Sequence, residues 1–496
     1  MAIDLNETGL EAGVSLEDEA GRQIRELPFQ ILVCGDFNNG KNSKPFAERA
    51  PIEIDRDNFD DVLGRFGPQI EIAAGETLEF RSIEDFHPDN IFENLPAFSR
   101  LRKLRQRLKD STAYAAAASE ARALFGIHGD QSPDQEIRGS KETGGLLAAI
   151  LSGKQSERPP SNLSSDLGRL IDELVRPHLV AVDENEQQSL LAAADASISA
   201  IMRAILHSKD FRHLEGTWRG LYFLCRQTAT STDLKIFVLD VSKAELAADL
   251  KSAENVSESR FYQILVRDAV ETVGSIPFSL VVGDYAFSGE IDDIAALIRI
   301  GKIALAAGAP FVSHIRPNVI GISSFAENPN PKMWRPAEDA PAAKLWKALR
   351  STPEAKSLGM TAPRFIGRLP FGADTDPTER FAFEEFDGQP AHDDYLWLNG
   401  GYAAAALLAK GFSRFGWEMG RSLPQEIGGL PVHIYKENGE TVYKPCAEIL
   451  MTDQSVQRLV EEGFMPLISD KSTDRVRLGK FQSISLPPAR LAARWN

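Results

Sequence analysis

One segment of the sequence has the spacing of a phosphate-binding loop. It begins at Gly35, continues as Asp-Phe-Asn-Asn to Gly40 and Lys41, and follows an apolar stretch that is typical of a buried strand. The next residue is Asn42, where such a loop needs Ser or Thr to bind Mg²⁺, and prolines interrupt the helix that should follow. We therefore interpret the segment as a strand-end turn, and a nucleotide-binding enzyme stays as the remote alternative.

Two acidic segments have closely spaced carboxylates of the kind that bind metal ions or take part in acid–base chemistry. The run 55–61 has alternate carboxylates, but Phe59 and Asp60 stand where a Ca²⁺ loop needs an oxygen ligand and a glycine, which favours a solvated helix start. Glu384 and Glu385 are adjacent, so in an extended chain they point to opposite faces. Salt bridges are therefore favoured over a carboxylate pair that shares a proton.

The remaining residues with reactive side chains are dispersed. His207 and His213 are six positions apart, which does not place them on one helical face, so we expect surface or packing roles. The three cysteines, Cys34, Cys225 and Cys446, show no metal-binding spacing and no disulfide framework. The serine hydrolase, zincin and dinucleotide motifs are absent from the sequence. The sequence thus predicts no catalytic residue, cofactor or metal, and a protein that is not an enzyme.

Composition narrows the choice of partner. The chain has 496 residues, with 55 Lys and Arg against 71 Asp and Glu, a net charge of −16 that disfavours nucleic acid and anionic membranes. The first 99 residues hold 21 acidic and 8 basic residues, a net of 8 − 21 = −13, whereas residues 100–109 carry six basic ones. That basic helix is either a solvated face with ion pairs or a surface that docks on an acidic one. The N-terminus lacks a signal-peptide core and no uninterrupted apolar run is long enough to span a membrane, which predicts a cytoplasmic protein.

Hydrophobic patterning predicts a multidomain α/β protein with mixed sheets flanked by helices. Residues 27–36 read as a buried strand that leads into one small α/β unit, and strands at 234–240, 278–284 and 310–315 alternate with helices near 242–254, 258–272 and 291–306. An apolar helix follows at 402–415, and Asn438-Gly439 marks a hairpin turn. We divide the chain into 1–128, a polar linker at 129–165 with a short docking helix, 166–340, and 341–496.

Several segments combine aromatic residues with Arg or Gly and match no catalytic motif. Trp, Tyr and Arg dominate interface energetics, and ordinary core packing is the alternative for the same residues. The interface or structural candidates are Trp218, Arg219, Asp284, Tyr285, Arg364, Arg368, Tyr395, Trp397 and Trp417.

At these segments the chain resembles the contractile sheath subunits of the bacterial type VI secretion system. Residues 14–126, here called the first portion, resemble the small subunit (TssB or VipA family) through ELPF, the strand ending in GDF, and IEIDRDNFDDVL. Residues 145–485, the second portion, resemble the large subunit (TssC or VipB family) through HLEGTWRGL, VVGDY, APRFIGRLPFG, DDYLWLNG and EEGFMPL. The resemblance identifies the chain as a fusion of the two subunits with a contractile tail-sheath-like fold.

The resemblance implies a structural protomer and several partners. Such protomers stack as hexameric rings in a helical sheath around an inner tube, start from a baseplate, and contract to drive the tube outward. In the family an AAA+ ATPase recycles contracted sheath through a helix whose counterpart here is near Leu146–Leu151, and fusion would enforce equal stoichiometry of the two portions. The resemblance implies neither nucleic acid nor direct membrane insertion.

One departure from the family concerns the C-terminus. Large subunits continue beyond the point that matches residues 480–485 into a long arm that links rings, which we expect to be lacking here and to come from a separate chain. The stretch from Val14 to Ile24 is expected to supply a strand to an intermolecular sheet. A sheath-like adaptor or cap that does not polymerise is therefore the alternative function.

Overall fold

The computed structural model describes residues 27–72, 76–110, 113–125, 186–335 and 340–495. These residues form two compact units. Unit 1 consists of described residues within 27–62, 216–368 and 396–495, and unit 2 of those within 63–215 and 369–395. Each unit therefore contains parts of both portions. The predicted linker at 129–165, its docking helix at Leu146–Leu151 and the strand predicted from Val14 to Ile24 lie outside the described residues.

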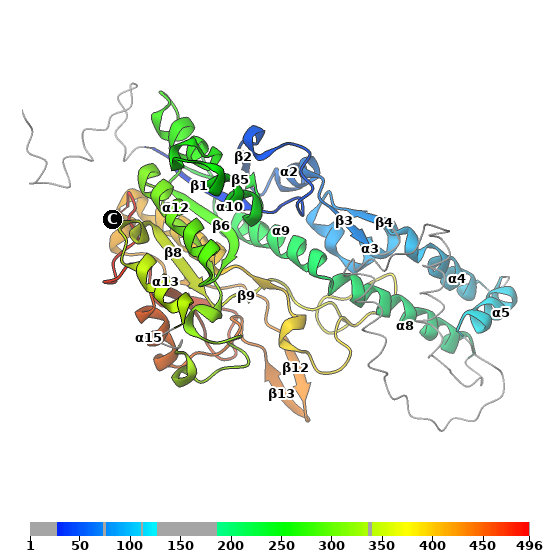
Figure 1. The fold of residues 1–496 in the computed structure, drawn as a ribbon. Coiled ribbons are helices and arrows are strands. Elements are labelled where there is room, and N and C mark those ends of the chain that lie inside the picture. The colour runs from blue at the N-terminus through cyan, green and yellow to red at the C-terminus, as the bar shows by residue number, and fades with distance from the viewer. Residues whose placement is uncertain (1–26, 73–75, 111–112, 126–185, 336–339, 496) are drawn as a thin grey trace, which may run out of the picture. The chain divides into compact units, whose positions relative to one another are not determined.

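A nine-stranded sheet forms the centre of unit 1 within the described residues (Figure 1). Its strands in spatial order are β11 (Glu426–Ile427), β15 (Val476–Leu478), β14 (Phe464–Ser469), β8 (Leu358–Ala362), β7 (Phe311–Ile315), β6 (Leu280–Phe287), β1 (Phe29–Gly35), β5 (Leu234–Asp240) and β2 (Ile52–Ile54). The run from β14 to β5 is parallel, and the strands outside it at both edges are antiparallel. The predicted α/β class with mixed sheets is confirmed.

Helices cover both faces of this sheet. The hydrophobic core on one face joins β1 and β6 to helices on the crossover connections, and α14 is buried against the other face beside β6, β7 and β8. The helices of unit 1 are η2 (Phe46–Glu48), α10 (Lys243–Ser252), η6 (Val256–Glu258), α11 (Arg260–Tyr262), η7 (Gln263–Glu271), α12 (Ile291–Ala307), η8 (Pro317–Ile320), η9 (Pro331–Met333), α13 (Pro341–Arg350), η10 (Pro353–Ser357), α14 (Gly400–Phe415), η12 (Gly416–Arg421) and α15 (Asp453–Glu461). The helix predicted at 258–272 is divided into η6, α11 and the π-helix η7.

Two small antiparallel pairs complete unit 1. They are β9 (Phe365–Ile366) with β10 (Trp397–Leu398), and the hairpin of β12 (Ile434–Glu437) with β13 (Glu440–Tyr443). The hairpin turn at Asn438-Gly439 has φ values of 51° and 85°, as expected for a two-residue turn that matches strand twist. The prediction of a hairpin here is confirmed.

Unit 2 is mainly helical. It contains the pair β3 (Gln69–Ile72) and β4 (Glu76–Glu79), the helices η4 (Ile83–Phe86), α3 (Pro88–Asn94), η5 (Pro96–Phe98), α4 (Ser99–Lys109), α5 (Tyr114–Phe125) and α8 (Glu186–Leu206), and η11 (His392–Asp394). The chain passes between the units within α2 (Phe59–Phe66) and α9 (Lys209–Gln227). Leu101, Leu104 and Leu108 are buried on one face of α4.

One described helix, α8, is long and apolar enough to pass a length-and-composition test for a membrane span. Half of its most apolar window is buried inside the protein. Its Asp195 also forms an ion pair with Arg105 of α4, at 2.6 Å. These contacts are those of a core helix that packs against α4 and α5.

Candidate assembly site

Strand β1 of the first portion lies between two strands of the second portion. Its residues pair in parallel with β5 from Phe29↔Leu234 to Gly35↔Asp240, and Ile31 to Cys34 pair with β6. All seven residues of β1 are buried, and β5 and β6 are neighbours of β1 rather than of each other. The expectation of one small α/β unit at the N-terminus is therefore wrong, because β1 and β2 are completed only by strands from the second portion.

An aromatic cluster surrounds the beginning of β1. The Phe29 ring lies 5.0 Å from Phe412, 5.7 Å from Trp417 and 5.5 Å from Trp495, measured between ring centroids. The indole N–H of Trp417 also donates to the backbone oxygen of Leu27 at 2.9 Å. The candidate Trp417 thus fixes the point at which β1 enters the sheet.

Trp218 holds the other end of β1. Its side chain is fully buried on α9, and its indole N–H donates to the backbone oxygen of Phe37 at 3.0 Å. Its ring meets Phe37 and Phe59 of the first portion edge to face, at 5.0 and 5.8 Å. Trp218 therefore stabilises the contact between the two portions of the chain, because aromatic pairs add to the stabilisation that comes from area burial.

The loop after β1 binds a carboxylate of the second portion. Asp240, which is 4% exposed at the end of β5, accepts the Phe37 N–H at 2.8 Å and the side-chain amides of Asn38 and Asn42 at 3.2 and 2.5 Å. Arg49 donates to the backbone oxygen of Asp240 at 2.9 Å. Burial raises the pKa of Asp240, and the amide hydrogen bonds oppose that rise. The P-loop-like turn thus directs its donors to an internal carboxylate, which supports the strand-end-turn interpretation.

Two further candidates, Asp284 and Tyr285, lie within β6. The Tyr285 hydroxyl donates to the backbone oxygen of Val241 at 2.7 Å, and its neighbour Asp284 is half-buried. Asn399, at the start of α14, donates its side-chain amide to the carbonyls of Gly283 and Tyr285 at 3.1 and 3.0 Å. These bonds tie α14 to the sheet edge where open α/β proteins often bind ligands, and they fill that edge with internal contacts.

The candidates after β8 differ in exposure. Arg364 binds Glu448 through its side chain at 2.6 Å, and its own backbone N–H donates to the same carboxylate at 2.8 Å. Arg368 is buried, whereas Trp397 is half-buried with the Lys444 ammonium 5.5 Å from its ring. Arg364 and Trp397 therefore both keep exposed surface, whereas Arg368 does not.

The last two candidates stand on different units. Arg219 is half-buried on α9 in unit 1. Tyr395 is 3% exposed in unit 2 and packs on Phe386 with ring centroids 5.0 Å apart. The structure therefore does not gather the nine candidates into one surface.

Unit 2 joins the portions through a second contact. Residues 369–395, here called the strap, belong to the second portion and contact helix α3 of the first portion. Asp89 accepts the backbone N–H groups of Glu379 and Arg380 at 2.8 and 3.0 Å, and Glu93 forms an ion pair with Arg380 at 2.6 Å. Ring stacking adds to the contact, since the centroids of Phe92 and Phe381 are 4.8 Å apart. Sequence reasoning missed Asp89, because an acid in the first turn of a helix is equally typical of a solvated surface.

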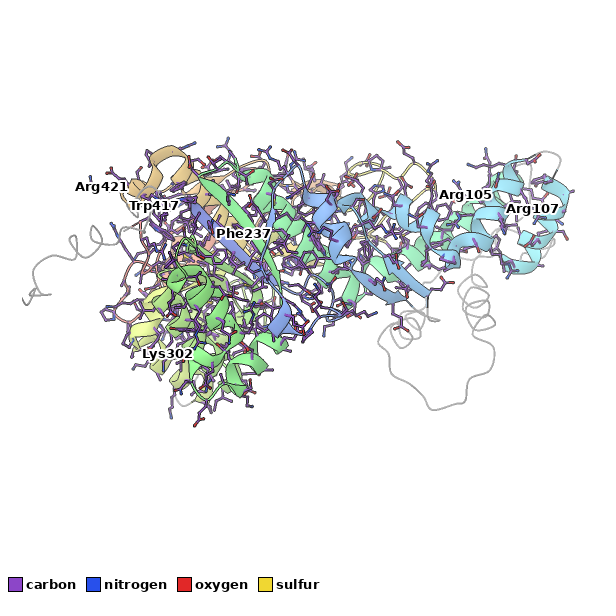
Figure 2. All side chains as sticks on the ribbon, turned by 90° about the horizontal axis from the view of Figure 1, so that it is seen from above. Arg105, Arg107, Phe237, Lys302, Trp417 and Arg421 are labelled. Carbon is purple, nitrogen blue, oxygen red and sulfur yellow. The ribbon has the colours of Figure 1, made fainter. Side chains whose placement is uncertain are left out.

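The basic side chains of helix α4 form ion pairs and hydrogen bonds within unit 2, and ion pairs are what the first of the two interpretations predicts. Arg107 pairs with Glu120 of α5 at 2.6 Å, and Arg102 donates to backbone oxygens of Phe92 and Glu93. Arg105, labelled with Arg107 in Figure 2, binds both Asp195 and the Arg380 carbonyl. Most of the positive charge of α4 is thus used inside unit 2.

The strap also separates the two adjacent glutamates. Glu384 accepts the Ala373 N–H at 3.0 Å, whereas the buried Glu385 accepts the Phe371 N–H at 2.8 Å and lies 3.5 Å from His207. Each carboxylate has its own structural contact, as the extended-chain argument predicts. His213 is exposed.

Reactive groups elsewhere in the described residues are buried or dispersed. No group of three or more His, Cys, Asp or Glu side chains in that part of the chain is placed to hold a metal ion. Burial raises the pKa of the Cys34 and Cys225 thiols, and it raises the pKa of Cys446 to about 11. These thiols are protonated at neutral pH, so they are poor nucleophiles. What the arrangement does is hold two portions of one chain together.

Comparison with known proteins matches the same two portions. The sequence model of the VipB family, described as EvpB and tail sheath N-terminal domain, covers residues 188–485, and that of the type VI secretion system VipA family covers residues 14–127. The chain is also 36% identical over 306 residues to the type VI secretion system sheath protein TssC1 of Pseudomonas aeruginosa. That alignment covers 60% of this chain and 61% of TssC1. The chain belongs to the VipB family of type VI secretion sheath proteins and carries a VipA sheath domain fused ahead of its VipB domain.

Proposed function

We propose that this chain is a structural protomer of a type VI secretion sheath, which polymerises around an inner tube and contracts to drive it outward. The observation that carries the proposal is the position of β1, because a VipA strand paired on both sides within the VipB sheet joins the two portions in one sheet. Free energy stored in packing between protomers would be the source of work. The proposal places the protein in the cytoplasm, with the baseplate and a recycling AAA+ ATPase as further partners.

A protruding hairpin supports polymerisation. β12 and β13 form their own two-stranded sheet, and Ile434 and Tyr443 at its base are 49% and 40% exposed (Figure 1). An exposed strand edge is a template for pairing with another chain. Strand addition here would let a neighbouring protomer extend the sheet without rearrangement of unit 1.

Electron microscopy of the purified full chain tests the proposal. We expect rings or sheath-like polymers when the inner tube protein and a chain carrying the C-terminal arm are co-expressed. The double variant Ile434→Asp/Tyr443→Asp should lose polymers at an unchanged melting temperature, because both side chains are exposed. Absence of polymers from the wild-type chain under all these conditions would overturn the proposal, and monomers that shorten preformed sheaths would support the cap instead.

A further inference from the structure

A cluster of cations and aromatic residues marks the end of α14 and the following helix η12. We call Lys410, Arg414, Phe415 and Arg421 the basic patch. Phe415 is 47% exposed, both arginines are exposed, and Arg421 lies beside Trp417 at one end of unit 1 (Figure 2). Exposed arginines next to a large aromatic side chain are the composition of an interface centre.

The charges of this patch are not balanced within the protomer. Lys410 and Arg414 stand one helical turn apart, and burial together with the Arg414 charge lowers the pKa of Lys410. The Lys410 ammonium donates to the neutral Gln227 side chain at 2.7 Å. In the described part of the chain neither Arg414 nor Arg421 forms an ion pair, and Glu418 of η12 pairs with neither. Like charges one turn apart destabilise a helix. An anionic partner would therefore reduce the repulsion between Lys410 and Arg414.

The same unit also exposes a group of acidic side chains, here called the acidic corner. Asp57, Asp60 and Asp61 are exposed where the chain leaves the edge strand β2 and begins α2. The corner and the basic patch stand on different elements, α2 and α14–η12. A contact that joins the patch of one copy to the corner of the next, and leaves the patch of that next copy for a third, is head-to-tail, and such contacts build rings or open helices.

We propose that the basic patch of one copy binds the acidic corner of the next copy. This inference rests on the proposed polymerisation and names one contact of the polymer. Arg414 and Arg421 face carboxylates there, while Phe415 excludes water from the ion pairs. Because such pairs form at a surface, the contact weakens as ionic strength rises.

Charge reversal with rescue tests the contact in the full chain. Arg414→Glu/Arg421→Glu and Asp57→Lys/Asp61→Lys should each raise the critical concentration for polymerisation by about tenfold or more. An equimolar mixture of the two variants should polymerise like wild type, because each reversed surface then meets its complement. Lys251→Glu/Lys302→Glu, at exposed sites on α10 and α12, changes the net charge as the arginine variant does and is the matched control for that variant.

The outcomes separate this contact from the proposed function. Failure of the wild-type chain to polymerise counts against the function itself. The proposed contact is wrong if either charge-reversed variant polymerises at the same critical concentration as wild type. It is also wrong if both variants are defective and their mixture does not polymerise. If the mixture is not rescued and deletion of residues 1–24 raises the critical concentration by the same factor, the basic patch binds the acidic N-terminal segment instead.

Discussion

The indole nitrogen of Trp218 lies 3.0 Å from the backbone oxygen of Phe37, although the two residues are 181 positions apart. This bond joins the VipB helix α9 to the VipA loop that follows β1. Together with Trp417, which binds the backbone of Leu27, it holds both ends of the VipA strand in the VipB sheet. The fusion therefore links two sequences that share one core.

Replacement of Trp218 by Ala should destabilise the protein strongly. The substitution removes a fully buried ring from between Phe37 and Phe59 and leaves a cavity, for which we expect a loss of about 3–5 kcal/mol in the free energy of unfolding. Thermal unfolding followed by circular dichroism measures the effect. Trp397→Ala, at a half-buried site, is the control and should cost much less; equal melting curves for Trp218→Ala and wild type would remove Trp218 from the contact.

Two glycines of α9 should respond in opposite directions to the same substitution. A Cβ on Gly220 would lie 2.2 Å from the buried Tyr402 ring, so Gly220→Ala forces the ring or the helix to move and should cost about 1–3 kcal/mol. A Cβ on Gly216 meets nothing closer than 3.8 Å, and Gly216→Ala should stabilise the helix by up to about 1 kcal/mol. Denaturant midpoints of the two variants test this, and a stable Gly220→Ala protein would show that α9 and α14 pack less closely.

Stability should fall in mild acid because of His314. Burial lowers the pKa of His314 to about 4, and the Glu448 charge only partly opposes this. Between about pH 6.5 and pH 4 the unfolded chain therefore binds a proton that the folded chain does not, so the folded state loses stability as pH falls. Between neutral pH and about pH 5 we expect His314 to account for about 2 kcal/mol.

Denaturant unfolding of wild type and His314→Gln at the two pH values isolates this contribution. The Gln variant should lose less stability on acidification, since the other titrating groups are common to both proteins. His213→Gln, at an exposed histidine, should follow wild type. A His314→Gln profile parallel to wild type would contradict the assignment.

Removal of the Asp240 charge should loosen the loop after β1. Asp240→Asn turns an acceptor of three N–H groups into a side chain with donors of its own, at a cost of about 1–3 kcal/mol. Faster amide exchange of Phe37 is the specific readout, because its N–H donates to Asp240. Asp36→Asn, at a half-buried carboxylate of the same loop that accepts the Gly40 N–H instead, should leave that exchange rate unchanged.

The same loop should not bind nucleotide. The Asp240 carboxylate accepts the Phe37 N–H and repels phosphate, so calorimetry with Mg-ATP should show no binding, and Lys41→Ala should change nothing. Binding of Mg-ATP that Lys41→Ala abolishes would restore the nucleotide hypothesis.

Local pattern was sufficient for most elements. The strand at Leu234–Asp240, the apolar face of α4 and the hairpin turn at Asn438-Gly439 follow from hydrophobic period and turn chemistry, which depend on near neighbours. The π-helix η7 was read as an ordinary helix, because the two share an apolar pattern and differ in hydrogen bonding.

The sequence by itself determined the α/β class, the family of each portion and the absence of familiar catalytic motifs, because these depend on residue types and short spacings. Only the tertiary structure decided that β1 pairs between β5 and β6, that Asp240 fills the loop after it, and that the strap binds Asp89. A strand buried on both sides has the same apolar pattern whichever partners it has. Its neighbours are chosen by packing and hydrogen bonds between residues some 200 positions apart, which no local pattern encodes.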